Sequence, residues 1–249
     1  ILAISPTHCL LLFLFNLLSF GTIFCSAAVF TVKNHCSFTV WPGYLSGNGA
    51  ALGNGGFSLS PGSSVQLQPP PGWSGRIWGR TGCKFDDSGS GKCITGDCGG
   101  VLKCSGGGVP PVTLVEFTIA GGSADNKDYY DVSLVDGYNV ALGVEAIGGS
   151  GDCQYAGCVA DLNANCPVEL RVMDSGSVVA CKSACTAFNT PEFCCTGDHA
   201  TPQTCSPTQY SKMFKNACPT AYSYAYDDAS SIRTCSGSDY LITFCPIGS

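Results

Sequence analysis

Carboxylates on strand-like segments are the residues of this sequence most able to do chemistry. Glu116 lies inside the apolar run VTLVEFTIA, residues 112–120. The run DYYDVSLVDG, residues 128–137, carries three more carboxylates: Asp128, Asp131 and Asp136. A pair of carboxylates across a groove is the machinery of glycoside hydrolysis, because one group protonates the leaving oxygen while the other attacks the sugar or activates water.

The same spacing also has a purely structural interpretation. A strand places alternate side chains on opposite faces, so Leu114, Glu116 and Thr118 share one face, which could be the solvent side of an outer strand. The pair Asp136-Gly137 is a hairpin signal by itself. The residues alone leave the catalytic and the structural interpretation open.

Other familiar chemistries find little support. Outside the first 27 residues the histidines are His35 and His199, and neither has the neighbours that a nucleophile and its base require. The glycine-rich run at residues 89–100 lacks a Gly-Lys-Ser/Thr ending and is not a phosphate cradle. The cysteines are expected to bond to one another, so neither a metal site nor a cofactor is predicted.

Charge limits the classes of partner. Only 12% of residues are charged, the formal net charge is −6, and no block of like charge occurs. This balance argues against nucleic acid or an anionic membrane as partner.

Residues 1–27 predict a secretory signal peptide. The stretch 10–24 is almost unbroken Leu, Phe and Ile, and it is too short for a convincing membrane span. Cleavage is expected between Ala27 and Ala28, where small residues gather. Because the chain starts at Ile1 without a Met, we expect the natural N-terminus to lie upstream.

The cysteine count predicts an oxidised, extracellular product. The sequence has 18 cysteines, of which 16 remain when Cys9 and Cys25 are removed with the signal. An even, dense set after a signal peptide predicts about eight disulfides and a soluble secreted protein.

The rest of the sequence is typical of an antiparallel β-sandwich or barrel. Short runs of β-branched and aromatic residues are broken by Gly, Pro, Ser and Asn. Strands are expected within residues 29–34, 38–43, 57–68, 75–81, 112–120, 129–146 and 241–249. One helix is expected between a cap at Ser206 and Pro219, with an apolar face made of Tyr210, Met213, Phe214 and Ala217.

Residues 89–104, GSGKCITGDCGGVLKC, contain a signature by which the sequence resembles the thaumatin-like proteins, the plant pathogenesis-related group-five family. The signature is spaced Gly, Gly and Cys, then Thr-Gly-Asp-Cys, then glycine and another Cys. Further blocks follow in family order: WGRTGC (78–83), PPVTLVEF (110–117), DVSLVDGYNV (131–140), FCCTGDH (193–199), CSPTQYSKMFKNACPTAYSYAYDD (205–228) and FCPIGS (244–249). The resemblance covers essentially the whole chain after residue 27.

The resemblance implies a mainly β, thaumatin-like fold. Its parts are a flattened β-sandwich core (28–80 and 113–157 with 219–249), a small disulfide-stapled loop domain (81–112), and a disulfide-rich domain with a helix (158–218). It also implies the disulfide pairs Cys36–Cys245, Cys83–Cys93, Cys98–Cys104, Cys153–Cys235, Cys158–Cys218, Cys166–Cys181, Cys185–Cys194 and Cys195–Cys205.

Family members of the antifungal type line a cleft with an arginine, a glutamate and three aspartates. The matching positions are Arg76, Glu116, Asp131, Asp136 and Asp227, with Asp228 as the alternative to Asp227. Since Asp131 and Asp136 are five residues apart, they would face opposite sides of a flat strand. Asp136 must therefore reach the cleft from the Asp-Gly turn, or a bulge must reset the alternation. Asp128 matches no cleft position and is expected at the surface.

By resemblance, the cleft is expected to bind β-1,3-glucan of fungal walls, with weak endo-β-1,3-glucanase activity. Glu116 would be the general acid, its pKa raised by neighbouring aspartates, and Asp136 the base or nucleophile. The other matching residues would bind substrate, and a stacking face is expected from Phe117, Tyr129, Tyr130, Tyr222 or Tyr224.

The alternative function is antifungal binding without turnover. Such a protein would permeabilise fungal membranes or recognise a receptor or a foreign enzyme. In either case we expect a secreted monomer in the apoplast, since the chain is acidic and ends four residues after Cys245.

Overall fold

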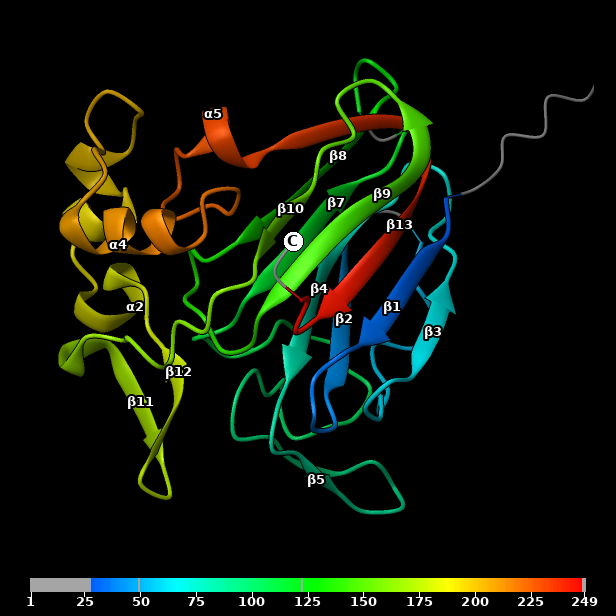
Figure 1. Cartoon of the computed structure of the whole chain (residues 1–249), viewed down its shortest axis with the longest axis horizontal. Coiled ribbons are helices and arrows are strands. Elements are labelled where there is room, and N and C mark those ends of the chain that lie inside the picture. The colour runs from blue at the N-terminus through cyan, green and yellow to red at the C-terminus, as the bar shows by residue number, and fades with distance from the viewer. Residues whose placement is uncertain (1–27, 49, 122, 248–249) are drawn as a thin grey trace, which may run out of the picture.

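The computed structural model describes residues 28–48, 50–121 and 123–247. The predicted signal peptide lies outside these residues. Most of the regular elements are strands in two layers, and a helix-containing region lies on one side of them (Figure 1). The expectation of a mainly β-sandwich fold is confirmed. Within the described residues, no helix combines the length and apolar character needed to cross a bilayer.

Two layers share one long strand. The first layer has, in spatial order, β2 (Trp41–Asn48), β4 (Ser74–Arg80), β7 (Leu114–Thr118) and β8 (Asp128–Ser133). The second has β3 (Ser64–Leu67), β1 (Phe30–Asn34), β13 (Arg233–Phe244), β9 (Leu142–Ser150) and β10 (Ala156–Cys158). The start of β13 pairs with β8, whereas its remainder pairs with β9 and, in parallel, with β1. Through β13, the sheet curls over and encloses a core.

Aromatic rings fill the space between the layers. Phe30 of β1 stacks on Phe117 of β7 with ring centroids 4.4 Å apart. Tyr240 of β13 lies 5.0 Å from Phe117 and 5.1 Å from Tyr130 of β8. These rings join both layers into one hydrophobic core, because each buries its surface against strands of the opposite layer.

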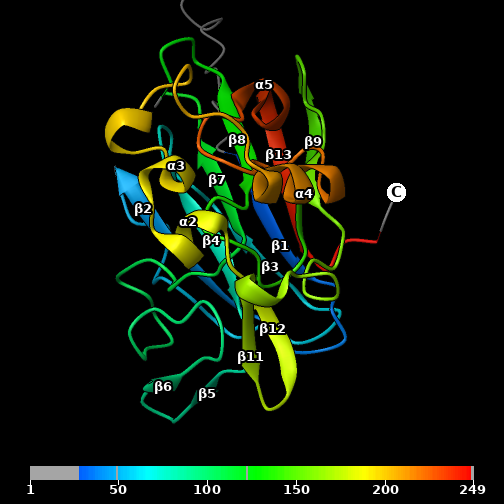
Figure 2. The same ribbon diagram turned by 90° about the vertical axis from the view of Figure 1, so that its left-hand side faces the viewer.

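The remaining elements lie outside the sandwich. Figure 2 views the molecule from the side of the helices. Two small hairpins are β5 (Lys84–Phe85) with β6 (Gly91–Lys92), and β11 (Arg171–Asp174) with β12 (Ser177–Cys181). The helices are η1 (Val168–Leu170), α2 (Ala184–Phe188), α3 (Pro191–Cys194), η2 (Gly197–His199), α4 (Gln209–Ala217) and α5 (Asp228–Ser231).

Helix α4 is the helix that the sequence predicts, with a different start. Its cap is Thr208, not Ser206, because the Thr208 hydroxyl accepts from the Ser211 backbone N–H while the Ser211 hydroxyl bonds back to the backbone N–H of Thr208. This reciprocal capping box satisfies two backbone groups that a cap two residues earlier would leave open. The expected apolar face does meet the core, with Phe214 fully buried.

Eight disulfides link the described cysteines in the pairs that the resemblance implies. Cys36–Cys245 spans 209 residues and ties β1 to the end of β13. Cys153–Cys235 spans 82 residues. In the chain-entropy model such long closures constrain the unfolded chain most, by roughly 4 to 5 kcal/mol each.

Arg80 attaches the stapled loop at residues 81–112 to the sheet. Its side chain is fully buried at the end of β4, where it donates to the carbonyl oxygens of Trp41 (2.9 Å), Val101 (2.8 Å) and Leu102 (2.7 Å). Burial lowers the pKa of Arg80 to about 10, while Asp97 acts in the opposite direction. The guanidinium is therefore charged at neutral pH, and its bonds hold the loop over one end of β4.

We expect Arg80→Met to destabilise the protein by roughly 3 kcal/mol, because the buried carbonyl oxygens lose their donor while the apolar stem is kept. Denaturant unfolding with the disulfides intact measures this change. Lys103→Met, an exposed lysine of the same loop, is the matched control. Equal stability of both variants would contradict the anchoring role of Arg80.

Candidate functional site

Three charged residues lie side by side across the first layer. Antiparallel pairing sets Arg76 of β4 opposite Glu116 of β7, and Glu116 opposite Asp131 of β8. Directly opposed residues on one face have their Cβ atoms about 5 Å apart. The register therefore brings one guanidinium and two carboxyl groups into a single row.

The neighbouring residue pairs on the same face of the sheet show why the Arg76–Glu116–Asp131 row is accessible. On one side, Trp78 pairs with Leu114, and both are buried beneath the stapled loop. On the other side, Thr118 pairs with Tyr129, and both are partly exposed. The loop thus covers one end of the face and leaves the Arg76–Glu116–Asp131 row at its edge. β7 lies between β4 and β8, so Glu116 does not belong to an outer strand.

Gly107 of the loop makes room for Arg76. A Cβ added to Gly107 would lie 2.9 Å from Arg76 Nη2. Among the described residues, no carboxylate lies within 4.0 Å of the Arg76 side-chain nitrogens. The guanidinium therefore faces the acidic residues across a gap.

Asp136 reaches the row from a turn. β8 ends at Ser133, and Gly137 N–H bonds to the Leu134 carbonyl oxygen at 2.9 Å, with Gly137 at φ +95°. Because Asp136 lies in this turn, it does not follow the alternation of side chains along β8. This is the arrangement that the sequence requires if Asp131 and Asp136 are both to line the cleft. The turn does not form the hairpin that Asp136-Gly137 suggests, because β8 pairs with β7 and β13 and not with β9.

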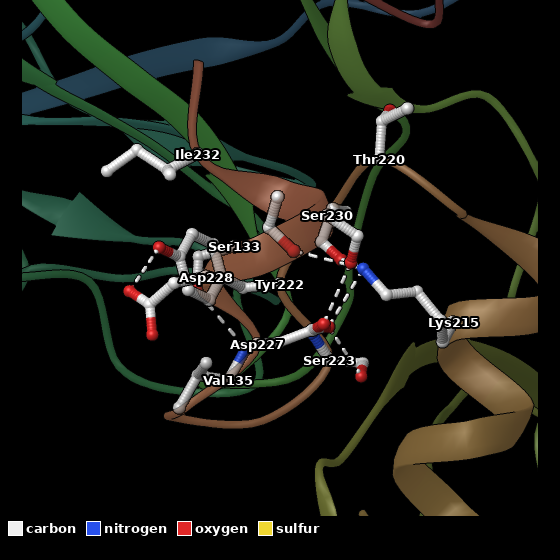
Figure 3. Close-up of polar contacts among 12 residues, drawn as sticks. Ser133, Val135, Lys215, Thr220, Tyr222, Ser223, Asp227, Asp228, Ser230 and Ile232 are labelled. Carbon is white, nitrogen blue, oxygen red and sulfur yellow. Dashed lines mark hydrogen bonds and ion pairs between the residues drawn. The ribbon is translucent and has the colours of Figure 1, made fainter. Parts of the chain in front are cut away.

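Asp228, not Asp227, lines the cleft, so the match to Asp227 is corrected. Asp227 points away into an ion pair with Lys215 at 2.8 Å (Figure 3). Asp228 accepts a hydrogen bond from the Tyr222 hydroxyl at 2.9 Å and borders the same hollow as Glu116. The two adjacent aspartates cannot be told apart in the sequence, because tertiary contacts decide which one turns inward.

Phe117 and Tyr130 do not offer a stacking face, which corrects a second prediction. Phe117 borders the hollow but is only 3% exposed, and Tyr130 is fully buried. Each neighbours a cleft acid in the chain, so strand alternation turns its ring into the core. Tyr129, on the same face as Asp131, places a ring at the edge of the cleft.

Asp128 is likewise not a surface residue. Its exposure is only 3%, and it accepts hydrogen bonds from the Tyr240 hydroxyl and the Ala120 N–H, both at 2.7 Å. A buried carboxylate needs such donors, and Asp128 joins the two layers of the sandwich.

Two adjoining hollows form what we call the acidic cleft. One has a volume of about 530 Å³ and reaches from Leu45 to Tyr129 and Ile232. The other, about 310 Å³, contains Asp136, Asp228 and Tyr222. Both share the charged row, so the row forms the floor of one continuous depression lined by Arg76, Glu116, Asp131, Asp136 and Asp228.

Burial raises the pKa values of the cleft acids. The pKa of Asp131 lies well above its usual value because of burial, with Glu116 and Asp228 adding to the effect. Burial also raises the pKa of Glu116 and of Asp136, and Arg76 opposes the rise at both. Asp136 adds a smaller contribution at Glu116, so desolvation, not the aspartates, is the main cause there.

One oxygen of Asp131 has no partner. Oδ1 is buried, and no hydrogen bond to it is found within the described part of the chain. An ionised carboxylate without donors is costly to bury, so the protonated acid is the form that the site favours. Among the described residues, no group of three His, Cys, Asp or Glu side chains could hold a metal ion.

The sequence named Tyr222 as one of several stacking candidates, and the structure places it in the cleft, whereas Ile232 was missed. Tyr222 is tied to β8, because its N–H bonds to the Val132 carbonyl oxygen and its own carbonyl oxygen accepts from Leu134 N–H. Ile232 borders the cleft at the C-terminal end of α5, directly before β13. Ile232 carries no local signal, since only long-range pairing brings it to the cleft.

Comparisons with known proteins agree with this architecture. The sequence model described as Thaumatin family matches residues 34–246. The chain is 64% identical over 229 residues to Pathogenesis-related thaumatin-like protein 3.5 of Cryptomeria japonica, covering 91% of this chain and 93% of that one. It is 51% identical to a Prunus avium protein named Glucan endo-1,3-beta-glucosidase, covering 93% and 95%.

Among solved structures, the chain resembles a family 64 β-1,3-glucanase of Paenibacillus barengoltzii with a TM-score of 0.53. The sequences are 12% identical, and the match covers 88% of this chain and 74% of the other. At this identity the likeness concerns the fold alone.

We expect Asp131→Asn to stabilise the protein increasingly as pH rises. An acid whose pKa is raised by folding stabilises the fold below its ordinary pKa of about 3.9, and that contribution is lost as pH rises through the raised value. Asn resembles the protonated acid and cannot ionise, so the variant escapes the loss.

Denaturant unfolding of variant and parent between pH 3 and pH 7 measures the effect. The exposed Asp198→Asn, outside the cleft, controls for removal of one acidic residue. A difference between Asp131→Asn and the parent that stays constant with pH would refute the buried-acid explanation.

Proposed function

This chain belongs to the thaumatin family, and we propose that it is a secreted plant defence protein whose acidic cleft binds β-1,3-glucan and hydrolyses it weakly. The observation that carries the proposal is the row of Arg76, Glu116 and Asp131 at the floor of the cleft. Its relatives include proteins named pathogenesis-related and thaumatin-like.

The chemistry of the cleft supports a carbohydrate ligand. Carboxyl groups accept hydrogen bonds from sugar hydroxyls, and a protonated carboxyl or the Arg76 guanidinium can donate to sugar oxygens. Tyr129 offers a ring edge or face at the rim for a sugar ring. The 51% identical relative named Glucan endo-1,3-beta-glucosidase supports a β-1,3-linked glucan among neutral sugar polymers.

For hydrolysis, Glu116 is the general acid of the proposal and Asp136 the base or nucleophile. Burial raises the pKa of Glu116 and so keeps a proton available for the leaving oxygen. Burial raises the pKa of Asp136 as well and Arg76 opposes that rise, so the proposal requires Arg76 to keep Asp136 in the ionised form that attacks the sugar or activates water. A carboxyl separation of about 5 Å would give retention, and about 6.5 to 9.5 Å inversion.

The cellular setting is part of the same proposal. We place the protein in the apoplast as a monomer that meets fungal walls, where its acidic charge and eight disulfides suit an oxidising, mildly acidic medium. The partner is the wall glucan.

We expect Glu116→Gln to lower the rate of laminarin hydrolysis by about 100-fold or more and to change glucan binding less than tenfold, because an amide keeps the shape but cannot supply the proton. Asp136→Asn should behave alike. Reducing-sugar release and a glucan pull-down on the purified, disulfide-intact protein measure the two properties.

Glu145→Gln is the matched control, since Glu145 is exposed on β9 in the other layer. Unchanged cleavage by Glu116→Gln would exclude the catalytic role. Glucan binding and growth inhibition by the parent without any sugar release would favour the non-catalytic alternative.

A further inference from the structure

Lys215 of α4 forms a compact polar network outside the cleft. Its ammonium donates to the Ala221 carbonyl oxygen at 2.8 Å and to the Ser231 hydroxyl at 3.0 Å, and it pairs with Asp227 Oδ2 at 2.8 Å. The side chains of Lys215 and Asp227 are 24% and 11% exposed. All three N–H donors of the ammonium therefore have a partner in a mostly shielded position.

Asp227 connects the ion pair with Lys215 to neighbouring residues through further hydrogen bonds. Its Oδ2 accepts from the N–H and the hydroxyl of Ser223, at 3.0 and 2.9 Å, and its Oδ1 accepts from the Ser230 hydroxyl at 3.0 Å. One carboxylate thus joins both ends of the turn that precedes and contains α5 (Figure 3).

Residues 219–234, the segment that contains Asp227, are held at both ends and need a contact such as the Lys215–Asp227 ion pair at their middle. Cys218 is held by Cys158, and Cys235 by Cys153, so disulfides fix the chain before and after residues 219–234. Between them lie Tyr222, Asp228 and Ile232, which are cleft residues outside the paired strands β4, β7 and β8. Tyr222 is tied to β8 by backbone bonds, whereas Asp228 is held by the bond from the Tyr222 hydroxyl, by the Ile232 N–H that bonds to its carbonyl oxygen, and by its neighbour Asp227.

We propose that Lys215 is a positioning residue of the acidic cleft: by fixing Asp227, it orients the segment so that Asp228 turns toward Asp131. Lys215 is not among the residues that line the two hollows, and its contribution reaches Asp228 through Asp227 and through its bonds to Ala221 and Ser231. The consequence for glucan rests on the proposed function, but the geometry of Asp228 does not.

The proposed position of Asp228 has a measurable effect on the pKa of Asp131. Asp131 is faced by Glu116 from β7 and by Asp228 from the segment, and both raise its pKa in addition to burial. The Tyr222 hydroxyl lies near the same acids. Release of Asp228 from its position would remove one of these contributions and move the pKa of Asp131 toward its usual value.

The test compares Lys215→Met, Lys215→Arg and Asp227→Asn with the parent. Lys212→Met is the matched control, because Lys212 is an exposed lysine of the same helix. NMR titration of the carboxyl carbons reports the pKa of Asp131 without any ligand, and laminarihexaose binding is measured separately.

In Lys215→Met and Asp227→Asn we expect the pKa of Asp131 to fall and laminarihexaose affinity to drop roughly three- to tenfold, a coupling typical of residues in one network. The double variant should show no further loss, Lys215→Arg should restore part of the effect, and Lys212→Met should match the parent. A merely structural role of Lys215 would lower stability without moving the titration of Asp131.

An unchanged pKa of Asp131 in folded Lys215→Met would overturn the proposal. If Lys215→Met does not fold, Asp227→Asn, which keeps the helix intact, decides by the same measurement. Should neither parent nor variants bind laminarihexaose, the glucan function fails, while the titration still decides whether Lys215 positions Asp228.

Discussion

The antiparallel register of β4, β7 and β8 is the constraint on which the site depends. A shift of one residue in either pairing would turn Glu116 or Asp131 into the aromatic core and bring an apolar side chain to the cleft. The core forbids that shift, since Phe117 and Tyr130 fill the space between the layers against Phe30 and Tyr240. The residues that cannot leave the core thereby hold the acids on the opposite face.

The residues of the cleft fall into two groups, one held by strand pairing and the other held by contacts outside the sheet. Arg76, Glu116 and Asp131 come from paired strands, whose backbone bonds leave little freedom. Asp136 and Asp228 come from a turn and a loop segment, and their positions depend on a handful of contacts beyond the sheet. Disulfides limit the segment at its two ends, and polar contacts such as the Lys215–Asp227 pair orient its middle.

Much of this could be predicted from the sequence, and the failures have physical reasons. Alternation and turn residues predict most strands of the sandwich, but the strand expected at 241–249 covers only the end of β13, and β10 was not expected. The disulfide pairs follow from the family resemblance. Strand alternation also predicts which tyrosine ring faces the cleft: if Asp131 faces the cleft, Tyr130 must face the core and Tyr129 the cleft. The choice between Asp227 and Asp228, in contrast, depends on Lys215, Ser223 and Ser230, which only the folded chain brings together.

Crowded acids make this cleft energetically costly and make its protonation depend on pH. Each of Glu116, Asp131 and Asp136 is partly removed from water, so its ionisation opposes folding, and Asp131 Oδ1 has no hydrogen-bond donor in the described structure. In a mildly acidic medium some of these groups retain protons, which lowers the mutual repulsion and leaves both donors and acceptors facing the cleft. A site with that mixture can bind a neutral, hydroxyl-rich polymer through both donors and acceptors, whereas full ionisation would remove the donors that the carboxyl groups supply.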